Sequence, residues 1–142
     1  MRRKQISVFI ENQPGHLQSI LEALEKEKVS ILALSVSDTA EFGIVRMIVD
    51  DADKGVSSLK RAGFTARIDP LLAYNIPDVP GGLLNSVIKP LSKAGINIKY
   101  FYAYIERGPE NKATVVFKPD NIDKAEAILC LLYTSPSPRD CS

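Results

Sequence analysis

The stretch Asn12-Gln13-Pro14-Gly15-His16-Leu17 returns 66 positions later as Asp78-Val79-Pro80-Gly81-Gly82-Leu83. In each copy an apolar run precedes the motif, and a run with helical periodicity follows it. Proline fixes φ and glycine tolerates unusual dihedrals, so each motif predicts a tight turn from a strand into a helix. Such a recurrence indicates a duplicated fold unit, and it decides the architecture.

Two further pairs of segments extend the repeat. Val29-Ser30-Ile31 matches Ile96-Asn97-Ile98 at an offset of 67, and Asp53-Lys54 matches Asp123-Lys124 at an offset of 70. The order is kept while the offset grows slowly. This pattern indicates two copies of one unit, with small insertions in the connections of the second copy.

The first copy predicts the element order βαββαβ. Its first helix shows apolar residues spaced i, i+3, i+4 and i+7, at Leu17, Ile20, Leu21 and Leu24. Strands are expected at 6–10, 31–37, 43–49 and 64–68, and a second helix at 51–62 with Gly63 just past its end. The core is expected to contain Val8 or its neighbours, Leu21, Leu24, Leu34, Val45 and Leu59.

The second copy repeats this order up to its second helix. Strands are expected at 71–76, 97–105 and 112–118, and helices at 83–94 and from about residue 122. Pro90 lies inside the first of these helices, where it removes one backbone hydrogen bond and should kink the helix. Asp120 or Asn121 can cap the second helix. Only Pro70 separates the two copies, so no flexible linker is expected.

The last thirteen residues depart from the repeat. Pro136 and Pro138 fall where Ala66 and Ile68 stand in the last strand of the first copy, and proline removes ladder donors. The string 131–140 also resembles translated sequencing-adapter read-through. We expect domains at 1–70 and 71–129, the second without its last strand, and a non-native tail at 130–142. A natural disordered tail is the alternative.

Composition excludes several classes of function. The hydrophobic fraction of 45% and the charged fraction of 25% are those of a globular protein. A net charge of +1 leaves no broad basic surface for nucleic acid. No apolar stretch approaches the roughly 18 residues that span a bilayer. The apolar run after Arg2-Arg3-Lys4 is too short for a signal peptide, so we expect a cytoplasmic protein.

The sequence offers few groups for metal binding or catalysis. His16 is the only histidine, and Cys130 and Cys141 both lie in the tail. Metal sites built on paired His or Cys ligands are therefore excluded, and a carboxylate site has no loop signature here. No Ser or Cys stands with a histidine base in a nucleophile motif. We expect no enzyme, cofactor or metal, although lysine and carboxylate catalysis stay open.

The two turns are the candidate ligand sites. A helix start presents backbone N–H groups that favour a carboxylate. The Asn12 amide can donate and accept at once, which suits the zwitterion of an amino acid. The competing interpretation is a tight turn that only starts its helix.

The strand expected at 97–105 carries three tyrosines. Tyr100, Tyr102 and Tyr104 alternate with Phe101, so Phe101 is expected in the core and the tyrosines on the face away from the helices. Three interpretations of the tyrosines stay open, namely a packing surface, the wall of a pocket, or base stacking. The RNA-recognition fold shares the strand order, but its Lys/Arg-Gly-Phe/Tyr signature is missing.

Taken together, the two motifs resemble the ACT domain family. Asn12–Leu17 is followed by Lys28-Val29-Ser30-Ile31, and Asp78–Leu83 by Gly95-Ile96-Asn97-Ile98. The resemblance covers residues 5–129. It implies an α+β fold of two tandem ferredoxin-like (ACT-like) units, with antiparallel sheets and helices on one face. It also implies regulatory binding of an amino acid beside this turn, often at an interface between two ACT units.

The resemblance assigns ligand binding to both turns. Asp78 replaces Asn12 in the second copy, and its carboxylate would repel a ligand carboxylate but could hold an ammonium group. We expect an amino-acid ligand, a homo-oligomer (a dimer) through sheet edges, and no nucleic-acid or membrane partner. The alternative is a structural or oligomerisation module whose turns bind nothing. The expected ligand-binding residues are Asn12, Gln13, Pro14, Gly15, His16, Leu17, Asp78, Val79, Pro80, Gly81, Gly82 and Leu83.

Overall fold

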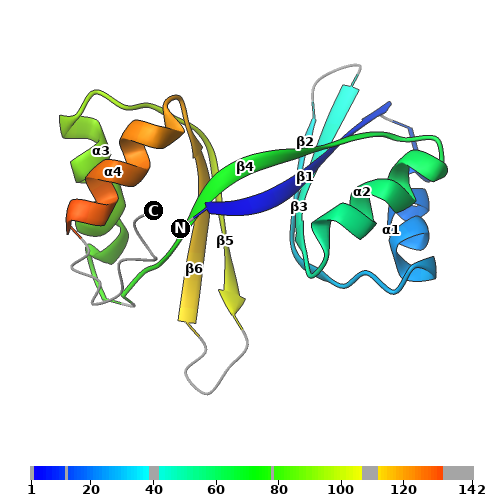
Figure 1. Cartoon of the computed structure of the whole chain (residues 1–142), viewed down its shortest axis with the longest axis horizontal. Helices are drawn as coiled ribbons and strands as arrows, with labels where there is room; N and C mark the ends of the chain where they lie inside the picture. The colour runs from blue at the N-terminus through cyan, green and yellow to red at the C-terminus, as the bar shows by residue number, and fades with distance from the viewer. Residues whose placement is uncertain (1, 12, 39–41, 78, 107–111, 133–142) are drawn as a thin grey trace. The chain divides into compact units, whose positions relative to one another are not determined.

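The structure, a computed structural model, describes residues 2–11, 13–38, 42–77, 79–106 and 112–132. The chain forms two compact units (Figure 1). The N-terminal unit is Lys4–Pro70, and the C-terminal unit is Met1–Arg3 together with Leu71–Ser142. Each unit is described by itself below.

The N-terminal unit has the predicted order βαββαβ. Its strands are hydrogen-bonded in the order β2-β3-β1-β4, and β3 is antiparallel to both β1 and β2. Helices α1 and α2 lie together on one face of these strands (Figure 1). The elements are β1 (Arg2–Glu11), α1 (His16–Lys26), β2 (Ile31–Asp38), β3 (Phe42–Val49), α2 (Ala52–Arg61) and β4 (Thr65–Asn75).

The core of this unit lies between the helices and the central strands. Its members include Ile6, Val8, Ile20, Leu24, Val45, Met47, Val56 and Leu59. Four of the expected core residues are therefore confirmed, namely Val8, Leu24, Val45 and Leu59. Leu21 is half-buried instead. The buried stripe of α1 is centred on Ile20 and Leu24, so the predicted helix phase holds, with Leu21 at its flank.

Leu34 was expected in this core, and that expectation is wrong because its side chain is 40% exposed. Its predicted face is correct, since Leu34 lies opposite Met47 in the ladder and Met47 is a core residue. The strand β2 stands at the edge of the unit, and only its Ile31 packs against the core. Val36, on the same face, is 50% exposed.

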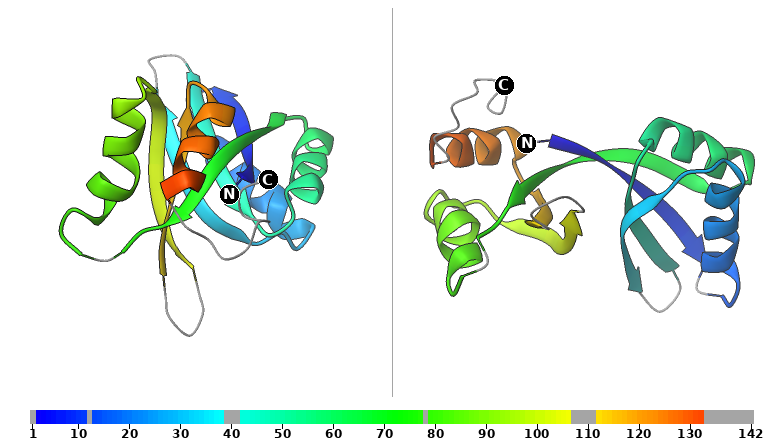
Figure 2. Two further views of the ribbon diagram at one scale, coloured as in Figure 1. Left: turned by 60° about the vertical axis from the view of Figure 1, so that its left-hand side comes forward. Right: turned by 90° about the horizontal axis from the view of Figure 1, so that it is seen from below.

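The C-terminal unit repeats the arrangement with the end of β4 as its first strand. The strand order is β4-β6-β5, with both pairs antiparallel. Figure 2 shows the helical segments of this unit on one face of its strands. The further elements are η1 (Leu84–Ile88), α3 (Lys89–Lys93), β5 (Ile98–Glu106), β6 (Lys112–Pro119) and α4 (Ile122–Leu132). The core includes Leu72, Val87, Leu91, Ile96, Val115, Phe117, Ala125 and Leu129.

The sequence suggested that Pro70 separates two strands, and the structure shows that it does not. It lies inside the single long strand β4. Proline has no N–H for a sheet ladder and is tolerated where that donor is not needed. The ladder between β4 and β6 runs from Leu72 to Asn75, so Pro70 lies outside it.

The expected disturbance at Pro90 takes the form of a π-helical turn. Residues Leu84–Ile88 form η1, and the Lys89 N–H donates to the Leu84 carbonyl, five residues back. A proline ring collides with the carbonyl four residues before it in a regular α-helix. The wider π turn relieves this collision, and the helix then continues as α3 to Lys93.

The faces of β5 are as predicted. Phe101 lies opposite Phe117 of the core, with their ring centroids 6.5 Å apart, whereas Tyr102 lies opposite Val116 on the other face. The expectation that Phe101 belongs to the core is nevertheless wrong, because its side chain is 38% exposed on β5, which is an edge strand as β2 is. Tyr100, Tyr102 and Tyr104 are half-buried.

The tail of the sequence lies mostly outside the described residues. The helix α4 continues to Leu132, and residues 133–142 are not described. The domain limits drawn from the repeat, and the interpretation of 130–142 as a non-native tail, therefore stay predictions.

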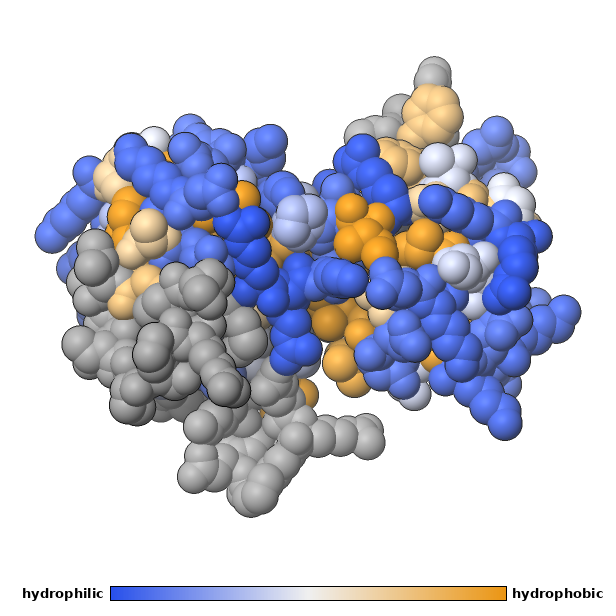
Figure 3. Space-filling model, in the orientation of Figure 1, coloured by the Kyte–Doolittle hydropathy of each residue, from blue (hydrophilic) through white to orange (hydrophobic). Residues whose placement is uncertain are grey.

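The hydrophilic surface of the described residues is interrupted by apolar patches in the view of Figure 3.

Candidate ligand-binding turns

The first turn connects β1 to α1 through a glycine in the left-handed region. The Gln13 N–H donates to the Glu11 carbonyl at 2.8 Å, and the His16 N–H donates to the Gln13 carbonyl at 3.4 Å. Gly15 has φ +92° and no atom within 4 Å of the place where a Cβ would stand. A side chain at position 15 would thus meet open space but a strained backbone.

Within the described residues, no side chain caps the start of α1. The Ser19 N–H makes a helical hydrogen bond to the Gly15 carbonyl at 3.0 Å, and the Ser19 hydroxyl donates to the same carbonyl at 3.0 Å. The first turn of the helix contains no acidic residue. The N–H groups that every helix start leaves without intrahelical partners therefore meet no capping side chain here.

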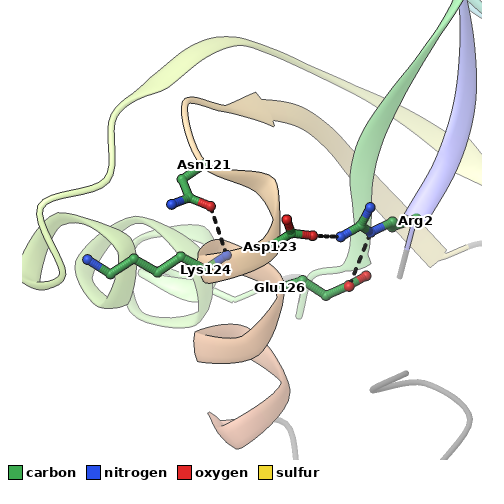
Figure 4. A network of polar contacts seen from close by, with 5 residues as sticks. All are labelled: Arg2, Asn121, Asp123, Lys124 and Glu126. Atoms are coloured by element: carbon green, nitrogen blue, oxygen red, sulfur yellow. Dashed lines mark hydrogen bonds and ion pairs between the residues drawn. The ribbon is translucent and has the colours of Figure 1, made fainter.

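The starts of α2 and α4 are built differently. The Asp51 carboxylate accepts from the Lys54 N–H at 3.1 Å, and the Asn121 side-chain oxygen accepts from the Lys124 N–H at 3.1 Å (Figure 4). Of the two caps that the sequence left open for α4, Asn121 is thus the one used. Asp53 and Asp123 add a carboxylate to the respective first turns. These two helix starts each have a side-chain cap, whereas the start of α1 has none among the described residues.

The second turn, between β4 and the helical segment that includes η1, has the same backbone pattern as the first. The Val79 N–H donates to the Pro77 carbonyl at 2.9 Å, and the Gly82 N–H donates to the Val79 carbonyl at 3.0 Å. The Asn85 N–H donates to the Gly81 carbonyl at 2.9 Å. Gly81 has φ +77°, so it corresponds to Gly15 in conformation as well as in sequence.

The second turn is more tightly filled. A Cβ on Gly82 would stand 2.3 Å from the Pro77 carbonyl oxygen, and a Cβ on Gly81 would stand 2.9 Å from the Asn85 side-chain nitrogen. His16 occupies the position of Gly82 in the first turn. An imidazole there shows that the first turn has room that the second one lacks.

The structure describes ten of the twelve residues expected to bind ligand; Asn12 and Asp78 lie outside the described residues. The exposed ones are Gln13, Pro14, Gly15, Val79, Pro80 and Gly81, while His16 is half-buried and Gly82 is buried. Leu17 and Leu83 pack against the cores of their units. Their side chains anchor the helices, so only their backbone could serve a ligand.

The position one helical turn after each glycine also contributes to the turns, although the two motifs do not include it. Ser19 in the first turn and Asn85 in the second contact Gly15 and Gly81, respectively. Side chains on a helix point back toward its N-terminus, which brings these residues over the turn. The repeat aligns Ser19 with Asn85, so comparing the two copies would have singled out this position.

A separate polar network lies in the C-terminal unit, at the side of α4. Arg2 donates to the carboxylates of Asp123 and Glu126 (Figure 4). These hydrogen bonds raise the pKa of the Arg2 guanidinium above its usual value, and the bond to Asp123 has a larger effect than the bond to Glu126. Arg2 therefore stays charged, and this network belongs to the fold of the unit rather than to either turn.

In the described part of the chain, no helix is long and apolar enough to cross a membrane. The described residues also hold no group of three or more His, Cys, Asp or Glu side chains that could bind a metal ion.

The family model of the ACT domain pair matches residues 1–134. The chain belongs to the ACT domain pair family. This match, together with the two βαββαβ-type units, confirms the resemblance drawn from the two turn motifs. The α+β fold of tandem ferredoxin-like units is likewise confirmed, and the described residues of this ACT domain pair hold six strands, which fits one missing strand.

Among solved structures, this ACT domain pair is similar to protein BT0572 from Bacteroides thetaiotaomicron. The identity is 37% over 93% of this chain and 89% of that one, with a TM-score of 0.83. The ligand-free regulatory subunit of aspartate kinase from Thermus thermophilus is 14% identical over 94% and 95% of the two chains, with a TM-score of 0.55. That of Thermus flavus is 16% identical over 91% of each, with a TM-score of 0.57. These two likenesses show the fold alone. A comparison with curated proteins gave no match.

Proposed function

We propose that this ACT domain pair is a regulatory module, without catalytic activity, that binds a small amino acid at a strand-to-helix turn. Family membership supports a regulatory role. The observation that carries the choice of ligand class is the start of α1, which has neither a capping side chain nor an acidic residue in its first turn. A ligand carboxylate can take the place of that cap.

The contrast with the starts of α2 and α4 supports this proposal. In α2 and α4 a side-chain oxygen already accepts from a backbone N–H, and an aspartate already complements the helix dipole. A ligand anion there would meet a negative side chain. At α1 it would meet backbone donors and the half-buried His16 instead.

The sequence supplies a second type of group at the first turn. Asn12 carries an amide that can accept from an ammonium group and donate to a carboxylate. An amino acid presents both groups on one carbon. We therefore propose that Asn12 and the backbone of Gly15–Leu17 bind the ligand's main chain, and that its side chain points elsewhere.

A thermal-shift screen of the purified chain against the twenty amino acids tests the proposal. Binding to the folded state at 100 times the Kd adds about 2.7 kcal/mol of stability. We expect one or two amino acids to raise the melting temperature selectively, and calorimetry should then give their Kd. A uniform absence of shift and of binding heat would leave the structural or oligomerisation module as the better description.

Two variants of the first turn locate the binding site. Asn12→Ala removes the amide and should weaken binding with little loss of stability. Gly15→Val should weaken binding through the backbone, because φ +92° is strained for a β-branched residue. Unchanged affinity in both variants, measured by calorimetry, would place the site elsewhere.

We also propose that the chain forms a homodimer by pairing of edge strands, and that it works in the cytoplasm. The strand β2 carries no charged or proline residue from Ile31 to Ser37, and Leu34 and Val36 are exposed on it. An unprotected edge of this kind favours pairing with another chain. Light scattering should show a dimer that Val36→Lys weakens, whereas Val79→Lys, at a residue 61% exposed in a turn, leaves it intact. A monomeric wild-type chain would refute the dimer.

A further inference from the structure

We infer that the first residues of β1 close the edge of the C-terminal unit at which the repeat places a last strand, and that Arg2 locks them there. This role is independent of the ligand proposed above. Among the described residues, the second copy ends with α4, so its own last strand does not cover the edge of Leu71–Asn75. An unpaired strand edge invites pairing with another chain, which is why its closure matters.

The repeat shows where a last strand of the C-terminal unit would lie. In the N-terminal unit, the last strand β4 is the neighbour of the first strand β1, on the side away from β3. In the C-terminal unit the first strand is Leu71–Asn75, and its neighbour on one side is β6. On the other side of β4 stands β1. The strand β1 therefore occupies the position that corresponds to a last strand.

The start of β1 is the part that reaches this position. The Ser7 hydroxyl donates to the Asp69 carboxylate at 2.8 Å, so this part of β1 lies beside the part of β4 that belongs to the N-terminal unit. The residues up to Arg3 group instead with the residues from Leu71 onward. The two strands thus run in opposite directions, and β1 passes into the N-terminal unit directly after Arg3.

Charged side chains on one face of β1 bind the second helix of both copies. Arg2 donates to Asp123 and also to Glu126, in the latter case from Nε at 3.2 Å (Figure 4). Lys4 donates to Asp53 at 3.3 Å. The repeat aligns Asp53 with Asp123. Corresponding aspartates of α2 and α4 therefore accept from two basic residues that stand two positions apart, on the same face of the strand.

The contact of Arg2 matters more to its unit than that of Lys4 does. In the N-terminal unit β1 is also held by its ladder with β3, which begins at Ile6, whereas the first residues of β1 precede that ladder. The Lys4 and Asp53 side chains are mostly exposed, and an exposed ion pair contributes little. The Glu126 side chain is only 13% exposed, so Arg2 neutralises a largely buried carboxylate.

Two charge reversals on the full chain form a matched pair that tests the inference. Arg2→Glu places a carboxylate against Asp123 and Glu126, whereas Lys4→Glu places one against Asp53. A third variant lacks the residues before Lys4 and removes the start of the strand itself. Circular dichroism checks that the two charge reversals keep the native secondary structure.

Hydrogen exchange followed by mass spectrometry compares residues 71–75 with residues 65–69 of the same strand. We expect exchange in 71–75 to rise about tenfold in Arg2→Glu and in the shortened chain, because losing a hydrogen bond to a charged group costs about that factor. Lys4→Glu should leave it unchanged, and residues 65–69 should stay protected in all three. Unchanged exchange in 71–75 of the shortened chain would overturn the inference. A rise there that Arg2→Glu lacks, or that Lys4→Glu shares, would overturn the role of Arg2 as the lock.

Discussion

At the scale of single residues, two crowded glycines should differ in how much stability they lose when a methyl group is added. In Gly82→Ala the new Cβ meets the backbone oxygen of Pro77 at 2.3 Å, and backbone cannot easily yield. We expect a loss of about 1–3 kcal/mol, as for overpacked sites. In Gly55→Ala the close contact is with the Ile6 Cδ1 at 2.7 Å, the end of a side chain rather than backbone, while Val49 and Leu24 lie at ordinary contact distance.

The Gly55→Ala variant is the control for this prediction. Alanine inside α2 gains about 1 kcal/mol of helix propensity, which offsets the movement of Ile6. Urea unfolding of both variants gives the comparison. Equal losses of unfolding free energy would show that the Pro77 carbonyl moves away readily, and that the second turn is less closed than described.

The sequence predicts the backbone conformation of the turn glycines better than it predicts which atoms surround them. The motifs around Gly15 and Gly81 predicted tight turns, and both residues have positive φ. The crowding at Gly82 was not predictable, because it depends on where the Pro77 carbonyl lies after folding. The two turns are equivalent in their sequence motif and backbone conformation, and they differ in how closely other atoms of the chain pack against them.

At the scale of elements, the helix caps should differ in their effect on stability. The Asp51 carboxylate accepts from the Lys54 N–H, so Asp51→Ala should cost about 1 kcal/mol. Ser19→Ala serves as the control, because the Ser19 hydroxyl donates to a carbonyl that already accepts a helical hydrogen bond. Its effect should stay within about 0.5 kcal/mol. A loss in Ser19→Ala as large as in Asp51→Ala would mean that Ser19 stabilises the start of α1.

The pattern of apolar residues predicted the elements well and their burial less well. Alternation placed Leu34 and Phe101 on the correct face of their strands. It could not show that β2 and β5 are edge strands whose outer residues the helices leave exposed. Similarly, Pro90 predicted a disturbed helix, but a π turn depends on whether the packing allows a wider turn rather than a kink.

At the scale of the whole molecule, two strands contribute residues to both units. The strand β4 gives Thr65–Pro70 to the N-terminal unit and Leu71–Asn75 to the C-terminal one. The strand β1 starts at Arg2, which binds Asp123 and Glu126 of the C-terminal unit, and continues into the N-terminal unit. Unfolding of either unit would therefore remove part of a strand that the other unit needs, and we expect the chain to unfold in one transition.

Equivalent leucines in the two cores test this coupling. Leu59 in α2 and Leu129 in α4 are both 0% exposed, and the repeat aligns them. Each substitution, Leu59→Ala or Leu129→Ala, should cost about 2–5 kcal/mol. If the strands couple the units, differential scanning calorimetry should show a single transition that moves down in both variants. Two transitions, with only one shifted by each substitution, would show that the units fold independently despite the strands they share.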